Sequence, residues 1–341
     1  LATPTAILAG SGAAAAGGVI FKGGDILERL AGITVVAFDK TGAVTSGRPE
    51  VCGIFPAGGM TADDLMALAA AVEAGSGHPL ARGITECTTG RGVTFTIAAE
   101  VCTQAGGGVS GLVSGQRVAV GNPRYLRGLG VSLPAELPDP AADGTVVYVA
   151  KEGVYVGAIA FQDRLRESAA QLVAYLGGRG IKSLLLSGDR QATVSRIGGI
   201  LGIGEARGEL LPEDKAKWVT DLRARSESVL MVGDGINDAP ALSSADVGCT
   251  MIGGSDVALE SSDLVIARPD LMRIRFAHRV ALRTMSVVRQ NLAWAFIYNL
   301  VGIPLAMSGR LTPIYAASAM AMSSLCVVGN SMRLLRLKDD K

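Results

Sequence analysis

The stretch ITVVAFDKTG, residues 33 to 42, runs an apolar segment directly into an aspartate, a lysine, a threonine and a glycine. A short apolar run that ends at such a turn is typical of a buried β-strand. In open α/β sheets, ligands bind outside the carboxyl ends of the strands, so a carboxylate at that point marks a functional position. Asp39, which ends this run, is therefore the first candidate for chemistry.

Further apolar runs alternate with helical patterns along the chain, at residues 183–186, 228–232 and 263–267. This alternation predicts an α/β fold with a doubly wound parallel sheet. Two of these runs also end in acidic, glycine-containing turns, Ser187-Gly-Asp189 and Gly233-Asp-Gly-Ile-Asn-Asp238. Because the carboxyl ends of parallel strands share one edge of a sheet, we expect these turns to meet the one that contains Asp39.

The residue types in these turns indicate phosphoryl chemistry. Carboxylates such as Asp39 and Asp234 bind a hard cation through oxygen, and the hydroxyls of Thr41 and Ser187 hold phosphate oxygens together with backbone N–H groups. The predicted ligands are therefore magnesium and a phosphoryl group. Taken singly, each residue is more often a cap or a turn residue, but three such turns on successive strand ends favour a site.

Three other polar residues complete this hypothesis. Lys215 would offset the negative charge of the transferring phosphoryl group, and Asn237 and Asp238 would position the shell of the metal. A carboxylate nucleophile such as Asp39 divides the reaction into formation and hydrolysis of an aspartyl phosphate.

The sequences DKTG at residues 39–42 and GDGINDAPAL at residues 233–242 resemble the phosphorylation and hinge motifs of P-type ATPases. This resemblance implies a haloacid-dehalogenase-like phosphorylation domain with Asp39 as the phosphorylated residue. The family usually has Thr-Gly-Asp where this chain has Ser-Gly-Asp, and Ala43 replaces a common threonine. The implied catalytic set is Asp39, Lys40, Thr41, Ser187, Gly188, Asp189, Lys215, Asn237 and Asp238, and the implied magnesium ligands are Asp39, Thr41 and Asp234.

The predicted sheet is interrupted by a segment, residues 49–157, that has its own pattern of helices and strands. Thr61 is suited to cap a helix whose apolar residues share one face, and strand-like runs follow it. We therefore expect a phosphorylation domain at residues 31–48 and 158–268, with an inserted α+β nucleotide-binding domain at residues 49–157.

Three motifs within the insertion resemble nucleotide-binding motifs of the heavy-metal subfamily of P-type ATPases: EAGSGHP at 73–79, GGGVSG at 106–111, and Gly121-Asn122. Alone, a histidine before proline more often caps a helix and a glycine run more often forms a turn. Gly77 stands where the subfamily usually has glutamate. The resemblance implies ATP contacts from Glu73, His78, Gly106, Gly108, Gly121 and Asn122.

Composition indicates that part of the chain lies in a membrane. Formal net charge is +1 with 18% charged residues, which excludes a nucleic-acid-binding face, whereas 49% hydrophobic residues and a mean hydropathy of +0.36 are high for a soluble enzyme. Residues 291–309 and 311–332 flank Arg310 and contain no other charge. Each approaches the ~20 residues that span a bilayer. Basic residues flank both segments, so the positive-inside rule predicts cytoplasmic outer ends and cytoplasmic catalytic domains.

The predicted arrangement at the two ends of the chain is therefore a membrane-helix end and linker at residues 1–30 and a two-helix transmembrane hairpin with a cytoplasmic tail at residues 269–341. Residues 1 to 20 are rich in alanine and glycine, which suits close helix packing. A small-residue linker is the alternative interpretation of this segment.

The predicted hairpin contains Tyr298-Asn299 in its first segment and Met320 and Ser324 in its second. A thioether is a soft ligand that suits copper(I) better than magnesium or calcium. The alternative is that methionine fills gaps and serine bonds to its own helix. Both segments resemble the copper(I)-transporting branch, and this implies copper ligands at Tyr298, Asn299, Met320 and Ser324, copper(I) as cargo, ATP and Mg²⁺ as cofactors, and a copper chaperone and membrane lipid as partners.

The resemblance is to the C-terminal portion of that family, because neither a Cys-Pro-Cys motif nor the Thr-Gly-Glu loop of an actuator domain occurs in this sequence. The implied function is ATP-driven copper(I) export through an aspartyl phosphate. Three alternatives stay open: copper transport for oxidase assembly, a soluble haloacid-dehalogenase-type phosphatase, and a non-catalytic remnant. A phosphatase would not need the segment 291–332, and a remnant would not need the complete catalytic set.

Overall fold

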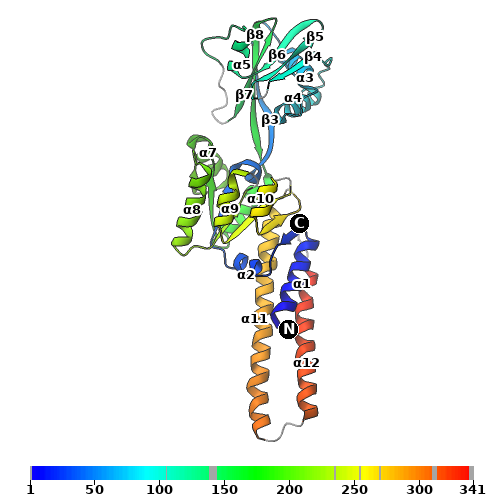
Figure 1. Ribbon diagram of the computed structural model, residues 1–341, viewed down its shortest axis with the longest axis vertical. Helices are drawn as coiled ribbons and strands as arrows, with labels where there is room; N and C mark the ends of the chain where they lie inside the picture. The colour runs from blue at the N-terminus through cyan, green and yellow to red at the C-terminus, as the bar shows by residue number, and fades with distance from the viewer. Residues whose placement is uncertain are drawn as a thin grey trace. The chain divides into compact units, whose positions relative to one another are not determined.

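The computed structural model describes residues 2–104, 106–137, 144–233, 236–252, 255–268, 270–308 and 313–337. The chain divides into two compact units: the first consists of Leu1–Val44 and Arg166–Lys341, and the second of Thr45–Leu165. The predicted insertion, 49–157, is shorter than this second unit at both ends. The second unit extends further because its first and last strands, β3 (Thr45–Pro56) and β8 (Val154–Leu165), are long and pair antiparallel with each other (Figure 1).

In its described residues, the first unit contains a seven-stranded sheet in the order β1-β13-β12-β11-β2-β9-β10. Five neighbouring pairs are parallel, and β1 pairs antiparallel with β13. Every apolar run singled out in the sequence forms a strand of this sheet. The strands are β1 (Val19–Phe21), β2 (Val35–Asp39), β9 (Lys182–Leu186), β10 (Glu205–Arg207), β11 (Val229–Val232), β12 (Val247–Met251) and β13 (Leu264–Ile266).

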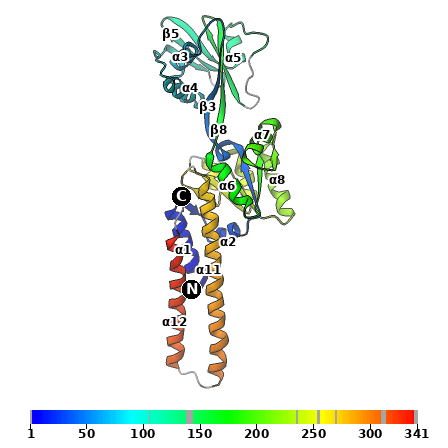
Figure 2. The ribbon, with the colours of Figure 1, turned by 180° about the vertical axis from the view of Figure 1, so that it is seen from behind.

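Helices pack on both faces of this sheet. Val35, Ala37 and Met231 point to one face, where they form a core with side chains of α8 (Pro212–Ala224), α9 (Ala239–Ser244) and α10 (Asp256–Ser261). Alternate residues such as Phe38 point to the other face, where α6 (Glu167–Gly177) contacts β9 and α2 (Asp25–Ala31) contacts β12 (Figure 2). The first unit therefore has the predicted doubly wound α/β architecture, and α7 (Gln191–Leu201) connects β9 to β10.

The second unit is an antiparallel sheet whose strand order is β3-β8-β7-β6-β5-β4. Its main core lies under α3 (Ala62–Glu73) and α4 (Pro79–Gly90), and a smaller core lies under α5 (Pro123–Gly128). As the sequence predicted, Thr61 caps α3, because its side chain accepts a hydrogen bond from the Asp64 N–H. The remaining strands are β4 (Ala99–Gln104), β5 (Gly108–Val113), β6 (Gln116–Gly121) and β7 (Thr145–Lys151).

Three helices of the first unit pack lengthwise: α1 (Ala2–Ala16), α11 (Met272–Met307) and α12 (Pro313–Met332), the last followed by the short helix η3 (Arg333–Arg336). Small residues permit this packing, since a Cβ on Gly10 would lie 2.2 Å from Thr284 Oγ1 and one on Gly17 would lie 2.1 Å from the Phe276 ring. Pro304 lies inside α11, which continues to Met307.

Among the described residues, no helix is both long and apolar enough to cross a membrane. The structure therefore leaves the predicted transmembrane spans at 291–309 and 311–332 unconfirmed.

Candidate functional site

Asp39 is the last residue of β2 and is only 5% exposed. One of its carboxylate oxygens, Oδ2, accepts a hydrogen bond from the Thr41 backbone N–H at 2.9 Å. The chain can turn back in this way because Gly42 has a φ of 74°, a left-handed conformation that glycine adopts without a steric cost. The turn that follows β2 thus orients the carboxylate that the sequence singled out.

Lys215, near the start of α8, lies against this carboxylate. Its ammonium group contacts Asp39 Oδ1 and, at 2.8 Å, Asp238 Oδ1, and all three side chains are buried. Burial alone would lower the pKa of Lys215, but the two carboxylates outweigh burial and raise that pKa above its usual value. The lysine is therefore held in its charged form, between two acceptors.

In the structure, Asp238 is a partner of Lys215. Gly233 allows this arrangement, because a Cβ at that position would lie 2.8 Å from the Cβ of Asp238. The role that the sequence assigned to Asp238, to position the metal shell together with Asn237, stays a prediction. Asn237 is exposed, and Asp234 lies outside the described residues.

The turn after β9 lies beside the turn after β2, since Asp39 is paired in register with Leu186. Ser187 is buried, and its hydroxyl exchanges hydrogen bonds of 3.2 Å with the N–H and a carboxylate oxygen of Asp189. Asp189 in turn forms an ion pair with Lys40. The structure thus joins two of the predicted turns through a Lys40–Asp189 pair, with Gly188 exposed between Ser187 and Asp189.

Sequence reasoning did not find Arg166. Its guanidinium donates to the carbonyl oxygens of Ala43 at 3.0 Å and Gly42 at 3.1 Å, and its backbone N–H donates to Val44 O at 2.9 Å. These bonds hold the turn that presents Asp39. Arg166 follows this turn by more than a hundred residues and belongs to no motif, so the sequence alone does not indicate the contact.

A pocket of about 440 Å³ lies within the second unit. Glu73, at the end of α3, is buried, and this burial raises its pKa against the opposing effect of a hydrogen bond from Ser76. Gln104 and Val147 also line this space, and neither belongs to a motif that the sequence analysis singled out. All six predicted nucleotide contacts line the pocket: Glu73, His78, Gly106, Gly108, Gly121 and Asn122.

Several of these six residues also support the fold. A Cβ on Gly108 would lie 2.3 Å from Val120 O, and one on Gly121 would lie 2.6 Å from Gly107 O, so close packing already requires glycine at both positions. The Asn122 side chain accepts from the Tyr125 N–H at 2.8 Å and donates to Gly106 O at 2.8 Å. His78 caps α4, because its Nδ1 accepts from the Leu80 N–H at 3.3 Å. These residues therefore have structural roles, as helix caps or in close packing, in addition to the predicted nucleotide contacts.

The residues predicted to bind copper lie on α11, which carries Tyr298 and Asn299, and on α12, which carries Met320 and Ser324. Asn299, Met320 and Ser324 are exposed, with Met320 at 65%. Throughout the part of the chain that the structure describes, no group of three or more His, Cys, Asp or Glu side chains could hold a metal ion. The assignment of Tyr298, Asn299, Met320 and Ser324 to copper stays a prediction.

Comparisons with known proteins agree with this geometry. A family profile of haloacid dehalogenase-like hydrolases matches residues 33–246. The chain is 41% identical to Copper-transporting ATPase 2 of Rhizobium meliloti over 98% of its own length and 42% of that protein, and 38% identical to the Copper-exporting P-type ATPase of Bacillus subtilis over 99% and 43%. A crystal structure of a zinc-transporting PIB-type ATPase in the E2.Pi state superimposes with a TM-score of 0.82 at 36% identity, over 98% of this chain and 55% of that one.

The matched range contains the whole predicted catalytic set, including Asp39, Ser187, Lys215 and Asp238. The chain spans less than half the length of the two copper-transporting relatives. It belongs to the haloacid dehalogenase-like hydrolase family and is similar, over almost its entire length, to metal-transporting P-type ATPases.

Proposed function

We propose that this chain holds the catalytic units of an ATP-driven metal transporter in which Asp39 is the phosphoryl acceptor. The observation that carries this proposal is the fixed carboxylate at the end of β2, bonded to the Thr41 N–H and contacting the Lys215 ammonium. A carboxylate oxygen of Asp39 attacks the γ-phosphorus of ATP, the bond to the β-phosphate oxygen breaks, and ADP leaves. Water then hydrolyses the aspartyl phosphate and returns the free carboxylate.

Lys215 has two tasks in this reaction. Its positive charge offsets the repulsion between the Asp39 carboxylate and the anionic γ-phosphate that it attacks. When Asp39 becomes an acyl phosphate, the negative charge lies on the phosphoryl oxygens instead of the carboxylate. The ammonium can then turn to those oxygens, and its bond to Asp238 keeps it near them. The Ser187 hydroxyl, the Gly188 N–H and the Thr41 hydroxyl supply further donors for those oxygens.

The donors around Asp39 fit a hard divalent cation, because they offer carboxylate and hydroxyl oxygen rather than sulfur or imidazole. Asp39, Thr41 and Asp234 would hold Mg²⁺. The ion, when bound, neutralises charge on the phosphate groups.

ATP binding is assigned to the pocket of the second unit. Its volume of about 440 Å³ lies in the range of small-molecule sites, and its lining combines an apolar wall, such as Val146 and Val147, with a few polar groups, such as Glu73 and His78. An aromatic base suits the apolar wall, and the polar groups orient it.

The long helices are assigned to a membrane, with both catalytic units on its cytoplasmic side. Large apolar side chains point outward along α11 and α12, where a water-exposed hairpin would carry polar ones. They include Trp294 (62% exposed), Phe296 (69%), Leu300 (62%), Ile303 (60%), Ile314 (77%) and Leu325 (67%).

Copper(I) is the proposed cargo. The relatives named above include both copper and zinc transporters. The choice of copper therefore depends on the Met320 thioether, together with Tyr298, Asn299 and Ser324, because no aspartate, glutamate or histidine occurs in the segments 291–309 and 311–332 that carry them.

Labelled ATP tests the reaction. With Mg²⁺ and γ-labelled ATP, the purified chain should acquire an acid-stable, hydroxylamine-labile phosphate, and Asp39→Asn should abolish it. Label that persists in Asp39→Asn would place the acceptor elsewhere. Release of phosphate from small esters without any trapped label would instead favour a phosphatase.

A further inference from the structure

Gln104, the last residue of β4, lines the pocket of the second unit but belongs to none of the motifs that predicted nucleotide contacts. The chain turns directly after it, because the Gly107 N–H donates to Gln104 O at 3.0 Å. Gly107 also leaves space for the glutamine side chain, since a Cβ at position 107 would lie 3.3 Å from Gln104 Cγ and 3.4 Å from its Cδ. The side-chain amide of Gln104 therefore lies beside Gly107, which lines the same pocket.

Two carboxamide side chains line this pocket, and each presents a hydrogen-bond donor and an acceptor side by side. Asn122 uses both groups within the protein, because it accepts from the Tyr125 N–H and donates to Gly106 O, each at 2.8 Å. The side chain of Gln104 is exposed and makes no hydrogen bond to the residues that the structure describes. Its donor and its acceptor are therefore available to a ligand.

Other polar groups reach the pocket from a different segment, the end of α3 and the start of α4. Glu73 contributes a buried carboxyl group. His78 Nδ1 accepts from the Leu80 N–H, so a neutral ring carries its proton on Nε2 and offers a donor there. Polar side chains thus enter the pocket both from the α3–α4 segment and from the turn between β4 and β5.

Adenine has two polar edges that suit such an arrangement. Its N6 amino group lies between two ring nitrogens, N1 and N7, and directs one hydrogen to each edge. A carboxamide matches the N6/N7 edge, because its oxygen accepts from N6 while its nitrogen donates to N7, a pairing that glutamine makes with adenine in DNA. Guanine has acceptors at both corresponding positions, O6 and N7, so a carboxamide can form only one of the two bonds.

We propose that Gln104 selects adenine in this pocket, with its side-chain oxygen accepting from N6 and its side-chain nitrogen donating to N7. Glu73 and His78 then face the N1 edge of the base. The inference rests on the proposed function, because it requires the nucleotide to bind in the second unit. Since the exposed amide is solvated before the nucleotide binds, each new bond replaces a bond to water and has a modest net effect.

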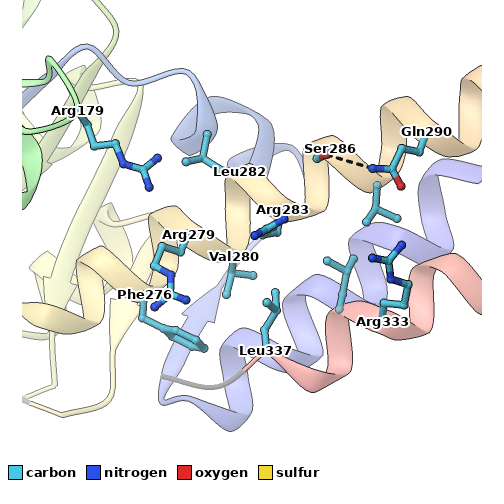
Figure 3. A pocket seen from close by; sticks show the side chains of 12 residues that line it. Arg179, Phe276, Arg279, Val280, Leu282, Arg283, Ser286, Gln290, Arg333 and Leu337 are labelled. Atoms are coloured by element: carbon cyan, nitrogen blue, oxygen red, sulfur yellow. Dashed lines mark hydrogen bonds between the residues drawn. The ribbon is translucent and has the colours of Figure 1, made fainter. Parts of the chain in front are cut away.

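The first unit contains another cavity, of about 550 Å³, along which arginine side chains such as Arg283 and Arg333 lie (Figure 3). Arginine binds phosphate oxygens whatever base is attached to them. A nucleotide that was held there through its phosphates would therefore not distinguish one base from another. Changes to single atoms of the base separate binding at the two cavities.

Calorimetric titration of the full chain in detergent, without Mg²⁺ so that no phosphoryl transfer competes, measures the affinity for each nucleotide. The first comparison is between ATP and 7-deaza-ATP, in which a carbon replaces N7. The unaltered chain should bind 7-deaza-ATP about fivefold more weakly than ATP, as loss of one hydrogen bond predicts. Gln104→Met keeps the unbranched stem but removes the amide. It should lower the affinity for ATP about tenfold and bind ATP and 7-deaza-ATP equally.

GTP provides a second comparison, and two variants provide controls. GTP should bind the unaltered chain more weakly than ATP, and Gln104→Met should reduce this preference about fivefold. Gln116→Met makes the same substitution at an exposed position of β6 that does not line the pocket. Arg283→Gln alters the other cavity. Both control variants should keep the ATP affinity and the preference for ATP over 7-deaza-ATP.

Three results would overturn the role of Gln104 and leave the proposed function intact. These are equal affinities for ATP and 7-deaza-ATP in the unaltered chain, a preference that persists in Gln104→Met, and a dependence on Gln104 that appears with 1-deaza-ATP instead, which would place the amide at the N1 edge. Two other results would also overturn the assignment of ATP to the second unit: no binding of any nucleotide, and weaker ATP binding in Arg283→Gln but not in Gln104→Met.

Discussion

A single ammonium group connects the ends of two strands in the proposed phosphorylation site. Lys215 contacts Asp39 at the end of β2 and Asp238 after β11, and its side chain is only 7% exposed. Removing one partner of a buried ion pair leaves uncompensated charge behind, which typically costs about 3–5 kcal/mol. Here two neighbouring carboxylates would lose their shared cation. Lys215 therefore acts on both the stability of the site and its chemistry.

Replacing Lys215 should slow phosphorylation and weaken the fold together. We expect Lys215→Gln to lower the initial rate of Asp39 labelling about a hundredfold or more, since a preorganised donor at a phosphoryl group contributes a factor of this order. Lys217→Gln removes the same charge from an exposed position of the same helix and should leave the rate unchanged. Rapid-quench labelling and denaturant unfolding measure the two effects. Normal labelling in Lys215→Gln would show that the ammonium is not needed.

At the scale of the element, hydrophobic pattern was sufficient to find most of the phosphorylation sheet. β2, β9, β11 and β13 are apolar runs, and their positions predicted both the fold class and the edge at which Asp39 and Ser187 meet. β10 was missed because it has three residues, Glu205–Arg207, two of them charged. β1 was missed because it is equally short and pairs antiparallel with β13, which lies more than two hundred residues later in the sequence. Local sequence cannot indicate such a contact.

Side-chain partners were harder to predict than strands. The contacts of Lys215 with Asp238 and of Arg166 with the turn at Gly42 join residues that are far apart in sequence, and neither contact has a motif of its own. The glycines at 108 and 121 were found by resemblance, but their packing requirement became visible only with the neighbouring strand in place.

Helix α1 provides a test of packing at the same scale. A Cβ on Gly10 would meet the buried Thr284 side chain at 2.2 Å, whereas one on Gly12 would meet only Leu335, at 3.9 Å. We expect Gly10→Ala to destabilise the helical bundle by about 1–3 kcal/mol through overpacking. Gly12→Ala should be neutral or stabilising by up to about 1 kcal/mol, because alanine is the better helix former.

Denaturant unfolding in detergent, followed by circular dichroism, compares these two variants. Thr284→Ala introduced into Gly10→Ala should restore much of the loss, since it removes the atoms that clash. If the double variant is no more stable than Gly10→Ala, the contact between α1 and α11 does not determine the effect.

At the scale of the whole molecule, the two units hold different parts of one proposed reaction. The phosphoryl acceptor and its lysine belong to the first unit, and the residues assigned to ATP belong to the second. Short, contiguous motifs made both sites visible in the sequence.

This division predicts that nucleotide binding and phosphoryl acceptance can be separated by the choice of phosphate donor. His78→Gln should raise the ATP concentration needed for half-maximal labelling of Asp39 about tenfold, the loss that corresponds to about 1.4 kcal/mol, while high ATP restores the maximal extent. Acetyl phosphate carries no base and does not need the pocket of the second unit. It should therefore label the unaltered chain and His78→Gln equally, whereas Lys215→Gln should be defective with both donors. Reduced labelling of His78→Gln by acetyl phosphate would show that the histidine supports the phosphorylation site itself, and the assignment of separate tasks to the two units would then be wrong.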